Sequence, residues 1–83
     1  MSIEEIQSKV AEILSAVLEI PVPAAGNLQR KDNPRWDSLK NIDVLFGIED
    51  TFGIQLRQAD LSRVGSQREL VELVQERRHA AQL

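Results

Sequence analysis

Ser38 is the residue of this sequence best placed to do chemistry, because it follows an acid and opens a stretch with helical spacing. A helix starting there would put its hydroxyl near the positive end of the helix dipole, where free backbone N–H groups stabilise a phosphate ester. The Asp-Ser pair alone is a weak signal, since such residues commonly cap helices. Its meaning therefore depends on the surrounding sequence.

Catalysis and metal binding by the chain itself are disfavoured by its residue types. There is no cysteine and a single histidine, His79, far from Ser38 in sequence. The chain thus has no thiol nucleophile, no pair of soft metal ligands and no histidine near Ser38 to act as its base. A chain of 83 residues buries only about 60% of its unfolded surface, which leaves little room for a deep active site. We expect neither enzyme activity nor a metal site, and a small hydrolase ranks last among the alternatives.

The net charge of -3 is concentrated in residues 37–52, which carry four acids and one base, Lys40. This acidic segment, without a basic face elsewhere, favours basic protein partners over nucleic acid. No apolar run approaches the roughly 20 residues that span a bilayer, and the first residues do not resemble a signal peptide. We therefore expect a cytoplasmic monomer that does not enter membranes.

Helical periodicity dominates the rest of the chain, which is 42% apolar but only 4% aromatic. This composition favours an all-α fold over β-structure or disorder. Capping-box spacings at Ser2 and Ser66, and Gly53 as a terminating residue, help to set the bounds. We expect one domain of three main helices and one short helix, over about residues 3–19, 38–52, 58–63 and 66–79. We expect a core that includes Ile13, Leu45, Phe52 and Leu70.

Residues 20–36 contain all three prolines and show no sustained period, so they predict a long loop. Loops of this length are uncommon in small domains unless they are functional. Leu28 and Trp36 are its expected anchors on the core, with Trp36 a packing residue.

The helix expected over residues 38–52 has two apolar sides, whereas a small domain needs one for its core. The predicted core side carries Val44, Leu45, Ile48 and Phe52. The second side carries Leu39, Ile42 and Phe46, with Asp43 and Asp50 at one edge and Glu49 at the other. This second stripe predicts a docking surface, unless neighbouring segments enclose the whole helix.

The segment from Trp36 to Ile54, Trp-Asp-Ser-Leu-Lys-Asn-Ile-Asp-Val-Leu-Phe-Gly-Ile-Glu-Asp-Thr-Phe-Gly-Ile, closely resembles the central motif of acyl and peptidyl carrier proteins. The flanking segments resemble that family in length and pattern. The resemblance implies a small right-handed up-down bundle. It also implies that a phosphopantetheinyl transferase attaches 4'-phosphopantetheine from coenzyme A to Ser38. The arm would supply the thiol that this cysteine-free chain lacks.

The same resemblance implies partner recognition through the helix that Ser38 opens. Its partners would be the transferase, an acyl- or aminoacyl-activating ligase, and downstream acyltransferases or synthases. The residues assigned to recognition are Asp37, Leu39, Ile42, Asp43, Phe46, Glu49 and Asp50.

Three features depart from carriers of the fatty-acid type: Lys40 in place of an acid, the bulky Phe46, and the modest net charge. They favour a specialised pathway, such as polyketide or nonribosomal peptide synthesis, and leave the cargo open. An alternative of another class is a helical adaptor that binds a protein through the Leu39, Ile42 and Phe46 stripe, with Ser38 only a helix cap.

Overall fold

Four α-helices and one turn of 3-10 helix make up the regular structure of the described residues, 2–82, in a computed structural model of the chain. Side chains are described for residues 2–78, so that of His79 lies outside them. The helices are α1 (Ile3–Leu18), α2 (Ser38–Phe52), α3 (Gln58–Arg63) and α4 (Gln67–Gln82), and η1 (Arg30–Asp32) lies in the long loop. The predicted all-α class is therefore confirmed.

Helix α1 begins as predicted, because the backbone N–H of Glu5 donates to Oγ of Ser2 at 3.2 Å in a capping box. It ends one residue before the predicted bound. Glu19 is in the left-handed conformation, with φ of 57°, and its N–H donates to the carbonyl of Ser15. Pro21 disfavours helical geometry at the residue before it, so the chain leaves the helix here.

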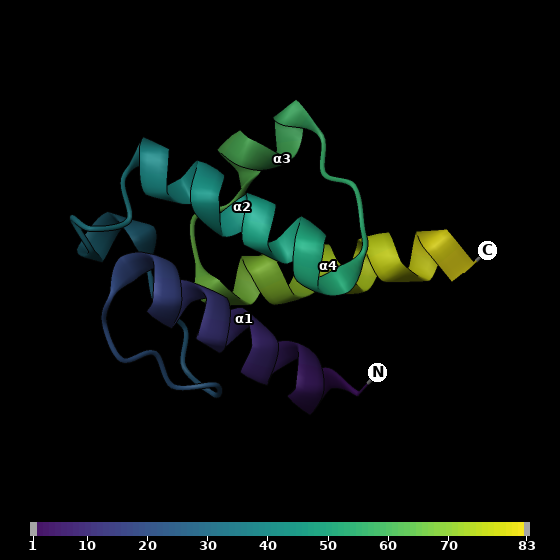
Figure 1. Cartoon of the computed structure of the whole chain (residues 1–83), viewed down its shortest axis with the longest axis horizontal. Coiled ribbons are helices and arrows are strands. Elements are labelled where there is room, and N and C mark those ends of the chain that lie inside the picture. Colours follow the sequence, from purple (N-terminus) through teal and green to yellow (C-terminus); the bar gives the residue numbers. More distant parts are fainter. Residues whose placement is uncertain (1, 83) are drawn as a thin grey trace.

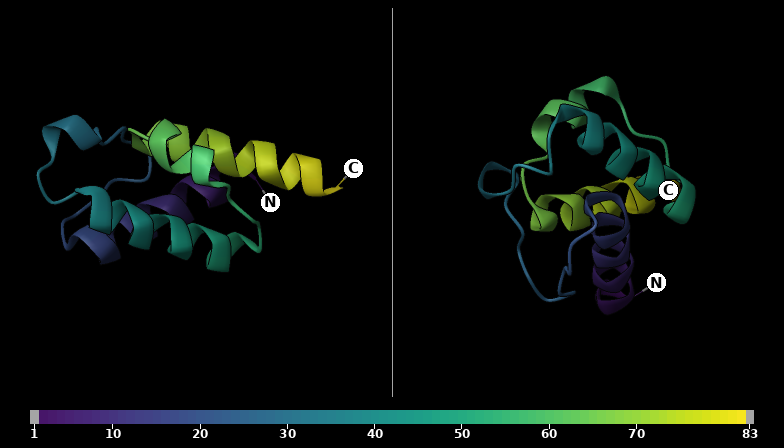
Figure 2. Two further views of the ribbon diagram at one scale, coloured as in Figure 1. Left: turned by 90° about the horizontal axis from the view of Figure 1, so that it is seen from above. Right: turned by 60° about the vertical axis from the view of Figure 1, so that its left-hand side comes forward.

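Helix α2 occupies the centre of the molecule, with α1 on one side and α3 on the other (Figure 1). The chain runs one way along α1 and the opposite way along α2 and α4, so both ends of the described chain lie at the same end of the molecule (Figures 1 and 2). Helix α4 packs against both α1 and α2. This arrangement leaves the start of α2 beside the long loop.

The core is formed by apolar side chains of all three long helices. Leu45, Phe52 and Leu70 are buried as predicted. Ile13 was predicted to lie in the core, and this is wrong: it is half-buried and packs against the edge of the core. Ile13 packs against Gly47 of α2, where a Cβ would lie only 3.0 Å from Cγ2 of Ile13, so it sits at the contact between the two helices instead of inside the core. Ile13 therefore fills a seam between the two helices.

Both predicted anchors of the long loop contact the core, with Trp36 fully buried and Leu28 partly buried. A third anchor, Gln67, was not predicted. Its buried amide accepts from the N–H of Leu28 at 3.0 Å and donates to the carbonyl of Pro23 at 2.8 Å. The backbone of Ser66 forms an isolated β-bridge with Gln29. Helix α4 consequently starts at Gln67, one residue after the predicted bound, and it continues beyond the predicted end to Gln82.

Candidate functional site

The hydroxyl of Ser38 is exposed at the first residue of α2, and Asp37, not Ser38, caps that helix. Oδ1 of Asp37 accepts from the backbone N–H of Lys40 at 2.8 Å. Capping by Asp37 satisfies one of the donors that the first turn leaves free. The interpretation of Ser38 as merely a helix cap therefore does not fit this geometry, and Asp37 has a structural task besides its predicted one.

A residue that the sequence did not point to, Arg30, lies next to the Ser38 hydroxyl. Its Nη2 donates to Oγ of Ser38 at 3.3 Å, and its Nε donates to the carbonyl of Trp36 at 3.1 Å. Arg30 opens η1, whose turn brings the side chain back towards α2. Helical or strand periodicity gives no signal for such a contact, because it depends on the path of an irregular loop.

An open cavity of about 340 Å³ adjoins Ser38. Asn41 forms part of its wall and is itself buried, donating through Nδ2 to the carbonyl of Leu61 at 3.1 Å. This bond holds α3 against the start of α2. The full lining is Arg30, Ser38, Asn41, Ile42, Leu61 and Ser62. The Ser38 hydroxyl thus meets a surface that is polar at Arg30 and apolar towards α3.

The outward side of α2 carries three exposed apolar side chains. Leu39 is 74% exposed, Phe46 62% and Ile42 38%. Asp43 and Asp50 at its edge are exposed as well. Helix α2 is therefore not enclosed by its neighbours in this structure, and the apolar stripe exceeds what the core uses. Its part in partner recognition stays a prediction.

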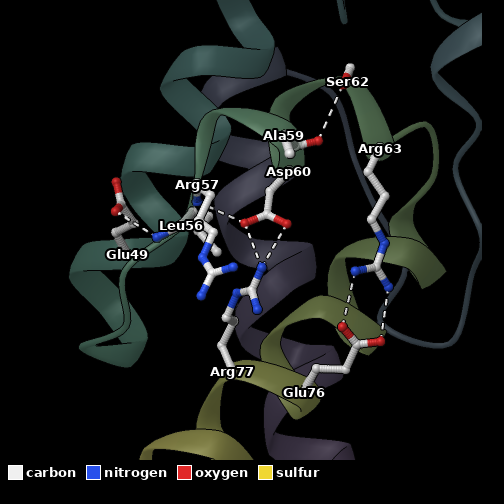
Figure 3. A network of polar contacts seen from close by, with 9 residues as sticks. All are labelled: Glu49, Leu56, Arg57, Ala59, Asp60, Ser62, Arg63, Glu76 and Arg77. Atoms are coloured by element: carbon white, nitrogen blue, oxygen red, sulfur yellow. Dashed lines mark hydrogen bonds and ion pairs between the residues drawn. The ribbon is translucent and has the colours of Figure 1, made fainter.

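Glu49, the acid at the other edge of the stripe, is half-buried. Its Oε2 accepts from the backbone N–H of Leu56 at 3.0 Å, which fixes the connection between α2 and α3 (Figure 3). Beside it, a smaller cavity of about 190 Å³ runs between Phe46 and Leu61. Glu49 consequently has a structural task that its place on the helical wheel did not predict.

An ion pair between the buried Asp60 and the partly exposed Arg77 joins α3 to α4 (Figure 3). Nη2 of Arg77 donates to both carboxylate oxygens of Asp60, at 2.8 and 2.9 Å, and the N–H of Arg57 donates to Asp60 at 2.7 Å. Burial alone raises the pKa of Asp60, but these hydrogen bonds and the charges of Arg77 and Arg63 together hold that pKa below its usual value. Asp60 is therefore a carboxylate at neutral pH and fixes α3 in place.

A second, exposed ion pair joins the same two helices. Both terminal nitrogens of Arg63 donate to the carboxylate of Glu76, at 2.9 and 3.0 Å, and these bonds lower the pKa of Glu76 (Figure 3). Exposed pairs of this kind contribute little to stability because water and salt screen them. Of the two ion pairs, that of the buried Asp60 with Arg77 thus contributes more to holding α3 against α4.

No group of three or more potential metal ligands comes together in the described part of the chain. No helix within residues 2–82 has the length and apolar character needed to cross a membrane. Comparisons of the chain with protein-family models, with curated proteins and with solved structures gave no match.

Proposed function

We propose that this chain is an acyl carrier, a non-catalytic protein in which Ser38 bears a 4'-phosphopantetheine arm taken from coenzyme A. The observation that carries the proposal is the exposed Ser38 hydroxyl at the start of α2. Because Asp37 caps this helix, the Ser38 hydroxyl is not used as the cap. The resemblance of the Trp36–Ile54 segment to the central motif of carrier proteins supports the same assignment. When bound, the arm supplies the thiol on which an acyl group is held as a thioester.

The surroundings of Ser38 fit such a group. Its hydroxyl accepts a hydrogen bond from the cationic Arg30 and adjoins the open cavity towards α3. During attachment the Ser38 oxygen forms the new bond to phosphorus, adenosine bisphosphate leaves, and the hydroxyl proton must pass to a base. Among the described side chains, only that of Arg30 is hydrogen-bonded to the Ser38 side chain, and a guanidinium cannot serve as a base at neutral pH. In this proposal the transferase supplies that base.

The exposed stripe of α2 is the surface on which partner enzymes dock in this proposal. Leu39 and Phe46 provide apolar area, while Asp43 and Asp50 attract Arg and Lys side chains of the partner. The partners are a phosphopantetheinyl transferase, an acyl- or aminoacyl-activating ligase, and the acyltransferases or synthases that collect the cargo. The chain direction does not alternate strictly as predicted, because α2 and α4 run the same way. A helical bundle of the acyl-carrier type, acting as a monomer, belongs to the same proposal.

A specialised biosynthetic pathway, such as polyketide or nonribosomal peptide synthesis, suits the chain better than primary fatty-acid synthesis. Lys40 places a positive charge two residues after Ser38, and the net charge is only -3. Phe46 adds a bulky aromatic ring, 62% exposed, to the stripe. A partner enzyme must accommodate both Lys40 and Phe46, so these two residues are the ones we expect to determine which partners bind.

Transfer of a labelled arm distinguishes a carrier from a simple adaptor. The unmutated chain, Ser38→Ala and Ser62→Ala are each incubated with a fluorescent coenzyme A and a transferase of broad specificity, and the labelled protein is measured on a gel. Ser62 is the matched control, because it is exposed and lines the same cavity. We expect label on the unmutated chain and on Ser62→Ala, and none on Ser38→Ala. Equal labelling of all three variants would contradict the assignment.

A further inference from the structure

The guanidinium of Arg30 is held in a fixed orientation beside Ser38. Its Nε is occupied by the carbonyl of Trp36 at 3.1 Å, and Trp36 is itself buried and therefore a firm anchor. This bond aims the terminal nitrogens towards α2, where Nη2 reaches Oγ of Ser38 at 3.3 Å. A pre-oriented guanidinium loses less side-chain freedom on binding an anion than a free one.

The charge of Arg30 is not neutralised by a contacting carboxylate. Within the described side chains, the ion pairs are those of Arg63 with Glu76 and of Arg77 with Asp60. The nearby Asp37 uses its Oδ1 to accept from the N–H of Lys40. Arg30 thus places an unpaired positive charge against a neutral hydroxyl. That hydroxyl accepts only one of the five N–H donors of the guanidinium.

We propose that Arg30 binds the phosphate esterified to Ser38, and so sets the direction in which the arm leaves the protein. This inference rests on the proposed function, since the arm is the source of the phosphate. The oxygens of a phosphate on Oγ lie one bond beyond phosphorus, within reach of Nη2 of Arg30, which is 3.3 Å from Oγ. Guanidinium groups match phosphate oxygens in charge and in geometry. Binding at Arg30 keeps the phosphate beside the cavity lined by Ile42 and Leu61.

The contact can be tested on a phosphate placed at Ser38 without any transferase. Phosphoserine is incorporated at position 38 of the chain, and the second pKa of its phosphate is measured by a pH titration followed by phosphorus NMR. The same titration is done on chains that also carry Arg30→Gln, Arg30→Lys or Arg35→Gln. Arg35 is the matched control, because it lies in the same loop and donates to the carbonyl of Leu18 instead. A contacting cation favours the doubly charged phosphate, so Arg30→Gln should raise its second pKa by about half a unit or more.

The control variants separate phosphate binding from loop packing. Arg30→Lys should restore part of the pKa shift, since it keeps the charge, while Arg35→Gln should change it by much less than Arg30→Gln. Tryptophan fluorescence of each variant reports whether the loop at Trp36 is preserved. A second pKa that is the same in the parent phosphoserine chain and in its Arg30→Gln variant, with fluorescence intact in both, would overturn the proposal.

Attachment of the arm itself is measured in parallel, so that the two proposals can fail separately. On chain loaded from coenzyme A, the phosphorus resonance of the diester should shift in Arg30→Gln and stay in place in Arg35→Gln. Loading of Ser38 with no effect of Arg30 on phosphorus would contradict the role of Arg30 and leave the carrier proposal standing. A transferase that never loads Ser38, despite a clear effect of Arg30 on phosphoserine, would contradict the carrier proposal and point to a phosphate monoester as the ligand.

Discussion

The indole N–H of Trp36 donates a hydrogen bond of 2.9 Å to Oδ1 of Asn41, and both side chains are buried. Asn41 in turn donates to the carbonyl of Leu61. A single amide therefore joins the long loop, α2 and α3 directly behind Ser38. The loop and α3, which flank Ser38 on either side, are held by the same buried residue.

Replacing Asn41 by Leu should destabilise the chain by about 1 to 3 kcal/mol, because the buried indole N–H of Trp36 is left without an acceptor. The free energy of unfolding is measured by chemical denaturation followed by tryptophan fluorescence. Thr51→Ala, an exposed change on α2, should remain within about 0.5 kcal/mol of the unmutated chain. Equal stability of Asn41→Leu and the unmutated chain would show that this bond contributes nothing.

The buried Asp60 should make the stability of the fold sensitive to acid. Its pKa in the folded chain lies below the ordinary value, so its carboxylate stabilises the fold above about pH 4. This stabilisation is lost as the pH falls through the lowered pKa. At neutral pH, Asp60→Asn should lower the free energy of unfolding by about 1 to 3 kcal/mol, because the partly exposed Arg77 loses its counter-charge. The difference in unfolding free energy between this variant and the unmutated chain should become smaller below about pH 4.

The partner variant Arg77→Met provides the control for that pH dependence. Without Arg77, burial remains and the main hydrogen bonds that lower the pKa of Asp60 are gone. The loss of unfolding free energy in acid should therefore shrink, or turn into a gain, in Arg77→Met. Unfolding free energies that follow the same pH profile in all three chains would exclude Asp60 as the group responsible.

Docking on α2 should separate into an effect of charge and an effect of apolar contact. Replacing Asp43 and Asp50 together by Lys should slow loading of Ser38 mainly at low ionic strength, because salt screens the attraction to a basic partner. Phe46→Ala should weaken binding of the transferase at every salt concentration, because it removes buried apolar area. Loading rates and binding constants are measured across a salt series, with helicity checked by circular dichroism.

A charge-matched control tests whether the position of the acids matters. Glu12 and Glu72 are exposed on α1 and α4, away from the stripe, and their joint replacement by Lys changes the net charge by the same amount. These substitutions should leave loading nearly unchanged. If they slowed loading as much as those at Asp43 and Asp50, net charge and not the α2 surface would govern the encounter.

The helices were predictable from the sequence because burial imposes a period on apolar residues. The burial of Leu45 and Phe52 follows from that period, while the bounds of α2 were predicted from Asp37-Ser38 at its start and Gly53 at its end. Contacts between distant polar groups leave no such trace. The bond of Arg30 to Ser38 depends on the path of a loop, and the bond of Glu49 to Leu56 depends on how the chain turns after α2.

One polar anchor did leave a signal in the sequence. Gln67 stands three and four residues before Leu70 and Val71, on the face that α4 buries. An uncharged polar residue on such a face needs hydrogen-bond partners, and the loop supplies them through Leu28 and Pro23. It was predictable that the amide of Gln67 needs hydrogen-bond partners, whereas the identity of those partners is known only from the path of the folded loop.

The most direct test of the carrier assignment is the intact mass of the chain after incubation with coenzyme A and a transferase of broad specificity. We predict the addition of one phosphopantetheinyl group per chain, located on Ser38 by fragmentation, and no addition to Ser38→Ala with its helicity intact. An unchanged mass of the unmutated chain, with a competent transferase shown to load another carrier in the same tube, would contradict the account, as would the group appearing on Ser38→Ala.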